Sequence, residues 1–336
     1  MRTLKTMINI NELVSGANTI AISAHVRPDG DAVGSTLGLY NYIKNNWPDK
    51  KVTVFLEKPE EIYSYLKGYE EIVTLEKKTA EEKLMFPAQI ESYDLFFALD
   101  VGDVDRLGEA AAYFEAAKKT VGIDHHVSNK GLCETNYIEA DASSTAELVY
   151  TAFDEDKVDV EVAKCIYTGI IHDTGVFQYS CTSKRTMEIA GKLITYGFDF
   201  TAIINKTFYE RTYKQNLILG RAVMESIRFM DKRCIAAVVD HKVMDFYGVT
   251  SADLQGIVNQ LLLTKGVECA IFMYEADPHT YKVSMRSGNL VDVASIATHF
   301  GGGGHVRAAG FTMTGTYHDI LNNVSELIEK QLDADK

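Results

Sequence analysis

Histidine and aspartate residues gather in four short groups in the first half of the chain. In chain order these residues are His25, Asp29 and Asp31 in HVRPDGD, then Asp100, then Asp124, His125 and His126 in DHH, then Asp173. Imidazoles and carboxylates without thiolates suit Mn²⁺ or a similar divalent cation better than a structural zinc site. Two such ions about 3.5–4 Å apart can clamp a phosphoryl group and activate water for in-line attack. The residue types therefore favour hydrolysis of a phosphoester.

Three of the four groups stand where an apolar strand is predicted to end. Residues 19–24 precede His25, the run LFFAL precedes Asp100, and residues 120–123 precede the DHH tripeptide. In an open α/β sheet, ligands bind beyond the carboxyl ends of the strands, so these groups are expected to converge. Asp29 and Asp31 can face different ions, and Asp100 is well placed to bridge two.

The elements around these groups alternate between strands and helices, which predicts a parallel sheet. The segment 182–227 has apolar residues at helical spacing, and the last third returns to strands and helices, beginning with a hairpin around residues 231–233. We therefore predict an α/β protein with two domains, the first with a parallel sheet and the smaller second one with a mixed sheet. The predicted boundaries are 1–185 for the first domain, 186–227 for a helical connector and 228–336 for the second domain.

A glycine-rich segment near the C-terminus is the second candidate site. Four glycines, Gly301 to Gly304, precede His305, and the segment VSMRSG lies just upstream with Arg286 and Ser287. Consecutive glycines let backbone N–H groups approach an anion closely. The segment, predicted between a helix and a strand, therefore favours phosphate binding.

Composition limits the class of partner. The chain has 336 residues, 46% of them hydrophobic, and a formal net charge of −13. Proteins that grip long nucleic acid usually carry a basic surface, so duplex DNA is not expected as a partner, whereas a short anionic substrate is compatible. Neither a targeting segment nor a membrane-spanning run is apparent, which predicts a cytoplasmic protein with no membrane partner. The five cysteines are dispersed without a CxxC pair, which argues against a disulfide framework and a cysteine zinc site.

These motifs together resemble the DHH phosphoesterase family. HVRPDGDAVGS, ALDVGDVDRLG, GIDHH and GIIHDTGVFQYS are similar to its four motifs in order, and GGGGHVRAAGF with VSMRSG is similar to the DHHA1 domain that follows in one subfamily. The resemblance spans essentially the whole chain. It is strongest to the compact two-domain group of nano-RNases (oligoribonucleases) and pAp phosphatases, which also includes cyclic-di-AMP and pApA hydrolases.

The resemblance implies a role for each candidate residue. One Mn²⁺ would be held by His25, Asp29 and Asp100, and a second by Asp31, Asp100, His125 and Asp173. Asp124 would orient His125, and His126 would face the scissile phosphate, so that Asp100, Asp124 and His126 are the expected catalytic residues. In the DHHA1 domain, the expected contacts to the terminal phosphate or adjacent nucleotide are Arg286, Ser287, Gly302, Gly303, Gly304 and His305.

The expected activity is hydrolysis of short RNA oligonucleotides, pApA-type dinucleotides and pAp, with two divalent cations, Mn²⁺ favoured, as cofactors. One alternative is an exopolyphosphatase or a pyrophosphatase-like hydrolase, as in related DHH enzymes. Another is a nucleotide sensor without catalytic activity. The choice among pApA, cyclic di-AMP, pAp, short RNA and polyphosphate stays open, as do a homodimeric state, the metal used in the cell and the roles of Arg106 and Arg307.

Overall fold

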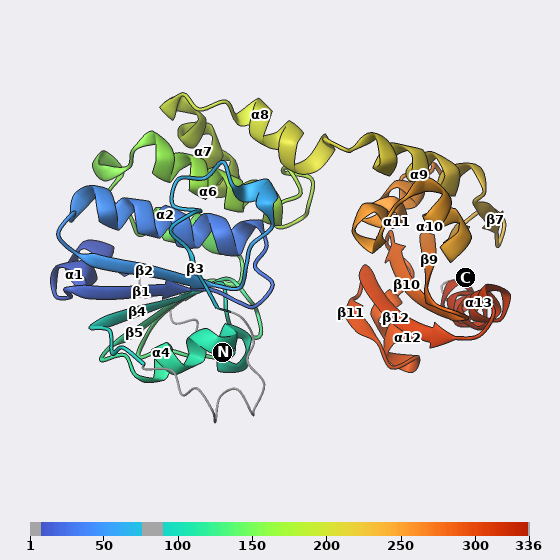
Figure 1. Ribbon diagram of the computed structural model, residues 1–336, viewed down its shortest axis with the longest axis horizontal. Helices are drawn as coiled ribbons and strands as arrows, with labels where there is room; N and C mark the ends of the chain where they lie inside the picture. The colour runs from blue at the N-terminus through green and yellow to red at the C-terminus, as the bar shows by residue number, and fades with distance from the viewer. Residues whose placement is uncertain (1–7, 76–89, 335–336) are drawn as a thin grey trace. The chain divides into compact units, whose positions relative to one another are not determined.

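The chain forms two compact units, Met1–Glu210 and Arg211–Lys336, each built around its own sheet. The structure is a computed structural model that describes residues 8–75 and 90–334 (Figure 1). The first sheet is entirely parallel and the second is mixed, as the sequence predicts. The predicted α/β class with two domains is therefore confirmed.

The first unit has six strands in the order β3-β2-β1-β4-β5-β6. This is the doubly wound order, in which the chain direction across the sheet reverses between the first and fourth strands. Ligands of such sheets bind beyond the carboxyl ends of the strands at this reversal. The strands are β1 (Thr19–Ser23), β2 (Lys51–Leu56), β3 (Val73–Thr74), β4 (Leu95–Leu99), β5 (Thr120–Asp124) and β6 (Thr135–Ile138).

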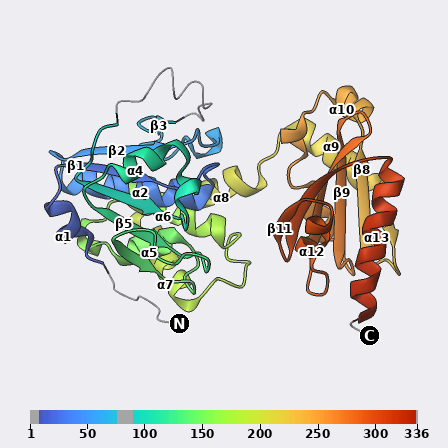
Figure 2. The same ribbon diagram turned by 90° about the horizontal axis from the view of Figure 1, so that it is seen from below.

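Helices cover both faces of this sheet (Figures 1 and 2). Alternate residues of β4 show how: Leu95, Phe97 and Leu99 pack on one side, whereas Phe96 and Ala98 pack on the other. The first side is covered by α1 (Ile10–Ser15), α2 (Gly30–Asn46), α5 (Thr145–Thr151) and α6 (Val160–Asp173). The second side is covered by the 3₁₀ segment η2 (Val104–Ala110) and by α4 (Ala111–Glu115), and the short turns η1 (Glu61–Tyr63) and η3 (Glu155–Lys157) join neighbouring elements.

Helices α2 and α6 approach each other closely because both carry a glycine at the crossing. A Cβ added at Gly34 would stand 2.6 Å from the backbone nitrogen of Gly169, and one added at Gly169 would stand 2.8 Å from the Oδ1 atom of Asp31. Any larger side chain would force the two helices apart. The crossing therefore brings the start of α2 and the end of α6, with Asp31 and Asp173, to the same place.

The segment predicted to be helical between the domains is helical. Its elements are α7 (Lys184–Leu193), η4 (Ile194–Tyr196), α8 (Phe200–Ile204), the π-helical turn η5 (Asn205–Tyr209) and α9 (Tyr213–Met224). The elements up to η5 fall in the first unit, whereas α9 falls in the second. Within the described residues, no helix combines the length and the apolar composition needed to cross a bilayer.

The second unit has six strands in the order β11-β12-β10-β9-β8-β7. The strands are β7 (Ile227–Phe229), β8 (Cys234–Val239), β9 (Cys269–Asp277), β10 (Thr280–Ser287), β11 (Gly303–His305) and β12 (Ala308–Thr314). One face is covered by α12 (Val293–His299) and α13 (Tyr317–Ala334), the latter lying along the strands in Figure 2. The other face is covered, over β8 and β9, by α9, α10 (His241–Tyr247), η6 (Ser251–Leu254) and α11 (Ile257–Leu262).

Two segments of the second unit differ from the sequence prediction. The sequence predicts one helix over about residues 252–264, but the structure divides this segment into η6 and α11, because Gly256 adopts a left-handed conformation with φ +80°. The glycine-rich segment is not wholly a loop, since Gly303–His305 forms the edge strand β11 beside β12. Gly303, Gly304 and His305, three of the predicted phosphate-binding residues, therefore stand on a sheet edge.

Candidate active site

The first three groups of histidines and aspartates meet at the carboxyl ends of neighbouring strands. His25 follows β1, Asp100 follows β4, and Asp124 is the last residue of β5. Strands β1 and β4 are adjacent at the reversal of the strand order, and β5 lies next to β4. Asp173 joins them from the end of α6. The convergence predicted from the sequence is therefore present in the fold.

One cluster of metal-binding groups surrounds the imidazole of His25. Its Nε2 atom lies 3.4 Å from Oδ2 of Asp100 and 3.6 Å from Oδ2 of Asp29. His25 and Asp100 are buried, whereas the Asp29 side chain is 57% exposed at the N-cap of α2. The donor atoms of these three residues lie within 4.8 Å of one another, close enough to share one cation.

A second cluster surrounds the imidazole of His125. Its Nε2 atom lies 3.0 Å from Oδ2 of Asp173 and 4.0 Å from Oδ2 of Asp31, and these three residues again offer donor atoms within 4.8 Å of one another. The same nitrogen lies 3.7 Å from Oδ1 of Asp100. Asp100 thus directs one oxygen to each cluster, which is the arrangement that a carboxylate bridging two ions requires.

The backbone at Asp100 is held in an uncommon conformation. Its φ is +54°, in the left-handed region that L-residues other than Asn and Asp seldom adopt. Its backbone N–H donates to the carbonyl of Ile123 at the end of β5. Leaving the strand in this conformation turns the carboxylate toward the two clusters, and strained conformations of this kind concentrate at functional sites.

The role of Asp124 differs from the one that the resemblance implies. Its Oδ1 atom accepts a hydrogen bond from Nδ1 of His126 at 2.7 Å, and its Oδ2 atom accepts one from the side-chain amide of Asn129 at 2.7 Å. His125 directs its Nδ1 atom toward the carbonyl of Ala142, at 3.4 Å. Asp124 therefore orients His126, not His125, and the Nε2 atom of His126 is the ring nitrogen that points away from this pair.

The clusters hold an excess of acidic groups. Burial by itself lowers the pKa of His25, but hydrogen bonds with the carboxylates of Asp100 and Asp29 outweigh it and raise the pKa to about 10. Burial also lowers the pKa of His125, but Asp173 and Asp31 outweigh this effect and raise the pKa to about 10. Burial and neighbouring carboxylates raise the pKa of Asp31.

This electrostatic environment fits divalent cations. Four carboxylates and two imidazoles crowd into largely buried clusters in which the carboxylates repel one another, and only oxygen and nitrogen donors are offered. Hard or borderline divalent ions prefer such donors, and positive charge relieves the repulsion. The residues present therefore suit Mn²⁺ or a similar ion.

In the second unit, Arg286 and His305 share one face of the sheet. Both residues pair with Ala308, Arg286 from β10 and His305 from β11, and directly opposed residues of a sheet direct their side chains to the same face. The glycine Gly303, two residues before His305, faces the same way, and a Cβ added there would meet only open space. The three residues outline an exposed face with two polar nitrogen groups and little bulk between them.

Ser287 lies apart from this face. It follows Arg286 directly in β10, and successive residues of a strand point to opposite faces. The side chain is buried, and its hydroxyl donates to the carbonyl of Val291 at 2.6 Å. Arg307 likewise donates to the carbonyls of Val291 and Asn289. The predicted substrate contact of Ser287 is therefore corrected to a structural role, because the alternation of the strand turns it into the core.

The remaining predicted glycines have packing roles. A Cβ added at Gly302 would stand 2.2 Å from the carbonyl oxygen of Gly310, and one at Gly304, whose φ is +147°, would stand 2.4 Å from the carbonyl oxygen of Ala308. Both glycines let β11 lie tightly against β12. Their exposed backbone still borders the face that carries His305.

A cavity of about 600 Å³ adjoins Arg286 within the second unit. It is lined by β9 and β10 on one side and by η6 and α11 on the other, and its polar side chains include Gln255, Asn259, Tyr274, Ser284 and Arg286. Cavities of this size hold small organic ligands. Arg286 is thus one of the residues that line this cavity.

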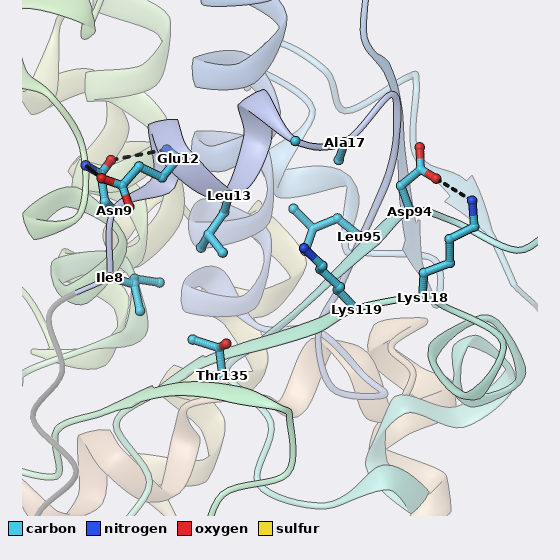
Figure 3. A pocket seen from close by; sticks show the side chains of 11 residues that line it. Ile8, Asn9, Glu12, Leu13, Ala17, Asp94, Leu95, Lys118, Lys119 and Thr135 are labelled. Carbon is cyan, nitrogen blue, oxygen red and sulfur yellow. Dashed lines mark hydrogen bonds and ion pairs between the residues drawn. The ribbon is translucent and has the colours of Figure 1, made fainter.

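Another hollow, of about 410 Å³, lies at the opposite end of the first sheet (Figure 3). Its lining includes the residues that begin β4, and Asp94 forms an ion pair with Lys118 across 2.8 Å. It faces the amino ends of the strands, whereas both candidate metal-binding clusters lie at the carboxyl ends. This hollow is therefore separate from the candidate active site.

Two polar residues that contact the clusters are absent from the sequence predictions. Thr145 donates its hydroxyl to Oδ1 of Asp100 at 3.0 Å, and Asn129 binds Asp124. The sequence does contain a signal for Thr145. Residues Ser144 to Glu147 have the S-x-x-E pattern of a helix N-terminus, which predicts an ordered turn there. No comparable pattern marks Asn129.

Comparison with known proteins agrees with this description of both units. Residues 19–170 match the model of the "DHH family, N-terminal domain", and residues 231–333 match the model of the "DHHA1 domain". The chain is 26% identical to the "Bifunctional oligoribonuclease and PAP phosphatase NrnA" of Bacillus subtilis, over 88% of this chain and 90% of that protein. It is 28% identical to the protein of the same name from Thermus thermophilus, over 91% and 89%.

A solved structure matches along nearly the whole chain. It is an "exopolyphosphatase-related protein" from Bacteroides fragilis, with a TM-score of 0.84 and 25% identity, covering 98% of each chain. Together with the two domain matches and with the motifs that meet at the carboxyl ends of the strands, these similarities identify the two parts of the chain: a DHH-family N-terminal domain over residues 19–170, followed by a DHHA1 domain over residues 231–333.

Proposed function

We propose that this protein is a phosphoesterase, dependent on divalent cations and most active with Mn²⁺, that hydrolyses short oligoribonucleotides, dinucleotides of the pApA type and pAp. The observation that carries the proposal is the position of Asp100, which directs one carboxylate oxygen toward each of two clusters of oxygen and nitrogen donors. The choice of substrate is supported by the relatives named as bifunctional oligoribonucleases and PAP phosphatases.

In this proposal one cation is held by His25, Asp29 and Asp100. The other is held by Asp31, Asp100, His125 and Asp173. Two divalent cations, when bound, supply positive charge to the phosphoryl group and activate water for in-line attack. The protein fixes the positions of the side chains that hold the cations. It does so through the strained backbone of Asp100 and the close crossing of α2 and α6.

His126 supplies the side chain that faces the substrate. Its Nδ1 donates to Asp124, which fixes the ring and directs Nε2 outward. The hydrogen bond and the charge of Asp124 raise the pKa of His126, which favours the form with a proton on Nε2. That N–H can donate to an oxygen of the scissile phosphate, where negative charge accumulates during attack.

Substrate selection is assigned to the second unit. Arg286 and His305 offer nitrogen donors to a phosphate remote from the hydrolysed bond, and the exposed glycines beside them let that phosphate approach closely. The adjoining cavity of about 600 Å³ gives room for the attached nucleoside. Ser287 takes no part, because it is buried on the other face.

The proposal is tested by comparing turnover of pAp, pApA, cyclic di-AMP, short RNA and polyphosphate with added Mn²⁺. We expect pApA, short RNA and pAp to be preferred by kcat/KM. Asp100→Asn keeps the shape of the side chain and tolerates a positive φ, so it isolates the carboxylate charge. It should abolish turnover and lower bound Mn²⁺ while the protein stays folded. Full activity of this variant would overturn the metal assignment, and a preference for polyphosphate would favour an exopolyphosphatase instead.

The assignment of the second unit is tested with Arg286→Ala and His305→Ala. Removing one charge-assisted hydrogen bond costs about 1.5–3 kcal/mol, roughly 10- to 150-fold in kcat/KM. The loss should appear with pApA or pAp and be small with bis-p-nitrophenyl phosphate, which has no second phosphate. Bound Mn²⁺ should stay unchanged. Equal losses on both kinds of substrate would show that this face does not bind the distal phosphate.

A further inference from the structure

Thr145, the first residue of α5, contacts two of the buried carboxylates in the metal-binding clusters. Its hydroxyl donates to Oδ1 of Asp100 at 3.0 Å, and its backbone N–H donates to Oδ2 of Asp31 at 2.7 Å. The next backbone N–H, of Ala146, donates to Oδ1 of Asp31 at 2.9 Å. Asp31 belongs to α2 and Asp100 follows β4, so a single turn of chain joins ligands from two different elements.

These contacts are shielded from solvent. The side chains of Thr145 and Asp31 are fully buried, and Asp100 is 2% exposed. A hydrogen bond to a carboxylate in such surroundings is stronger and more directional than one at the surface. Both oxygens of Asp31 are fixed by backbone donors that no side-chain change removes, whereas the orientation of Asp100 depends on a side-chain hydroxyl.

The turn that carries Thr145 is itself anchored on its other side. Glu147, fully buried in α5, accepts hydrogen bonds at 2.6 Å from Ser143, from Thr186 and from the guanidinium of Arg185. Arg185 also pairs with Glu139 at 3.0 Å. Since Arg185 and Thr186 belong to α7, the start of α5 is connected to a neighbouring helix and cannot follow a rotation of the Asp100 side chain.

We propose that Thr145 is a positioning residue for the cation site, whose hydroxyl holds the carboxylate of Asp100 in the orientation that serves both clusters. The inference rests on the proposed function, since it assigns Thr145 to the same cations. In this proposal the Thr145 hydroxyl acts through Asp100, whereas the backbone N–H of the same residue holds Asp31. The strained backbone sets the direction in which Asp100 leaves the strand, and the hydroxyl fixes the rotation of its carboxylate.

The test measures Mn²⁺ affinity of the full-length protein by competition with a chelating dye, in the absence of substrate. Thr145→Val has nearly the same shape without the donor, and loss of a group that orients a metal ligand typically weakens metal binding about 10- to 100-fold. Thr145→Ser keeps the hydroxyl and should bind Mn²⁺ within a few-fold of the unmodified protein. The value of kcat should follow Mn²⁺ occupancy and recover at saturating metal more fully than in Asp100→Asn.

Thr36→Val is the matched control. Thr36 is also fully buried, and its hydroxyl donates to backbone carbonyls of its own helix, at Ala32 and Val33. The same isosteric change there should leave Mn²⁺ affinity unchanged. Thermal unfolding in the presence of chelator checks that each variant is folded. If Thr145→Val is not folded, Thr145→Ala replaces it, because alanine removes the hydroxyl without adding a methyl group beside Asp100. The expected loss of Mn²⁺ affinity is the same.

Three outcomes would overturn the inference. Unchanged Mn²⁺ affinity in folded Thr145→Val or Thr145→Ala would show that the hydroxyl does not position Asp100. An equal loss in Thr36→Val would show a general effect of removing a buried hydroxyl. An unmodified protein without Mn²⁺ affinity would overturn the proposed function itself, and with it this inference, so the two failures are distinguishable.

Discussion

The carboxylate of Asp100 has an oxygen directed toward each of the two imidazoles, His25 and His125, and this single residue links the two clusters. A buried carboxylate so placed needs hydrogen bonds and positive charge, because burial penalises its charged form. The protein supplies a hydroxyl from Thr145 and two imidazoles, and the remaining excess of carboxylates leaves the clusters suited to cations.

This charge balance predicts a pH dependence for the metal-free protein. Neighbouring carboxylates raise the pKa of His25 and of His125 to about 10, well above the ordinary histidine value of 6.5. The protonated imidazoles therefore stabilise the folded protein fully below pH 6.5, and this contribution is lost as pH rises through 10. The urea midpoint measured with excess chelator should fall between pH 6.5 and pH 10. His25→Gln, which cannot be protonated, should show a smaller fall, and an unchanged fall would contradict the assignment.

At the same scale, the sequence predicts which residues gather but not every partner. The strands that precede HVRPDGD, Asp100 and the DHH tripeptide predict that these candidate metal ligands lie together. The pairing of Asp124 with His126 depends on the path of the chain after β5, which residue types alone do not define. Ser287 is separated from Arg286 by one step in a strand, and the side chains of adjacent strand residues point oppositely. Its placement was predictable only once the strand was known to run through it.

Among the elements, the edge strand β11 shows how the glycines of one run divide into two roles. Gly302 and Gly304 face the core side of the sheet, where an added Cβ would meet the backbone of β12. Gly303 faces the side of Arg286 and His305, where an added Cβ would meet open space. The first two glycines are needed for packing, and the third leaves room for a ligand.

These two roles predict opposite effects for the same substitution. Gly302→Ala should destabilise the second unit by about 1–3 kcal/mol, because the backbone must shift to admit the methyl group. Gly303→Ala should leave stability within about 0.5 kcal/mol, yet reduce kcat/KM for pApA several-fold by obstructing the approach of a phosphate. Chemical denaturation and kinetics on pApA and bis-p-nitrophenyl phosphate measure both. A Gly303→Ala protein with unchanged kinetics on pApA would argue against phosphate binding at this edge.

Sequence patterns predict the central strands of both sheets more closely than the edge strands. Continuous apolar runs such as LFFAL belong to central parallel strands, which are buried on both faces. The edge strands β6 (TNYI) and β11 (GGH) lack such runs, and neither is predicted as a strand. The apolar stripes of α7 and α9 indicate helices correctly, but a stripe does not tell which core it packs against, so the assignment of each helix to a unit comes from the structure.

For the whole molecule, two separate hydrophobic cores underlie the two units. Strands β1, β2, β4, β5 and β6 share a core with α2, α5 and α6, whereas strands β8, β9, β10 and β12 pack on α12 and α13 or on α9 to α11. A net charge of −13 gives little attraction for long polyanions. In the proposed function, local groups bind the short anionic substrate: the cations at the first unit, and Arg286 and His305 at the second.

Separate cores predict two unfolding transitions with separate responses to ligand. Trp47 is the only tryptophan of the chain and packs beside Tyr42 in the first unit, so its fluorescence reports that unit alone, whereas far-ultraviolet circular dichroism reports both. Because Mn²⁺ is proposed to bind the first unit, 100-fold excess over its dissociation constant should stabilise that unit by about 2.7 kcal/mol. The midpoint of the transition followed by fluorescence should rise. The midpoint of the second unit's transition, followed by circular dichroism, should stay unchanged. Asp100→Asn should remove the rise, and Gly302→Ala should lower only the second transition. Coincident transitions by both probes, moving together with Mn²⁺, would mean that the units unfold as one.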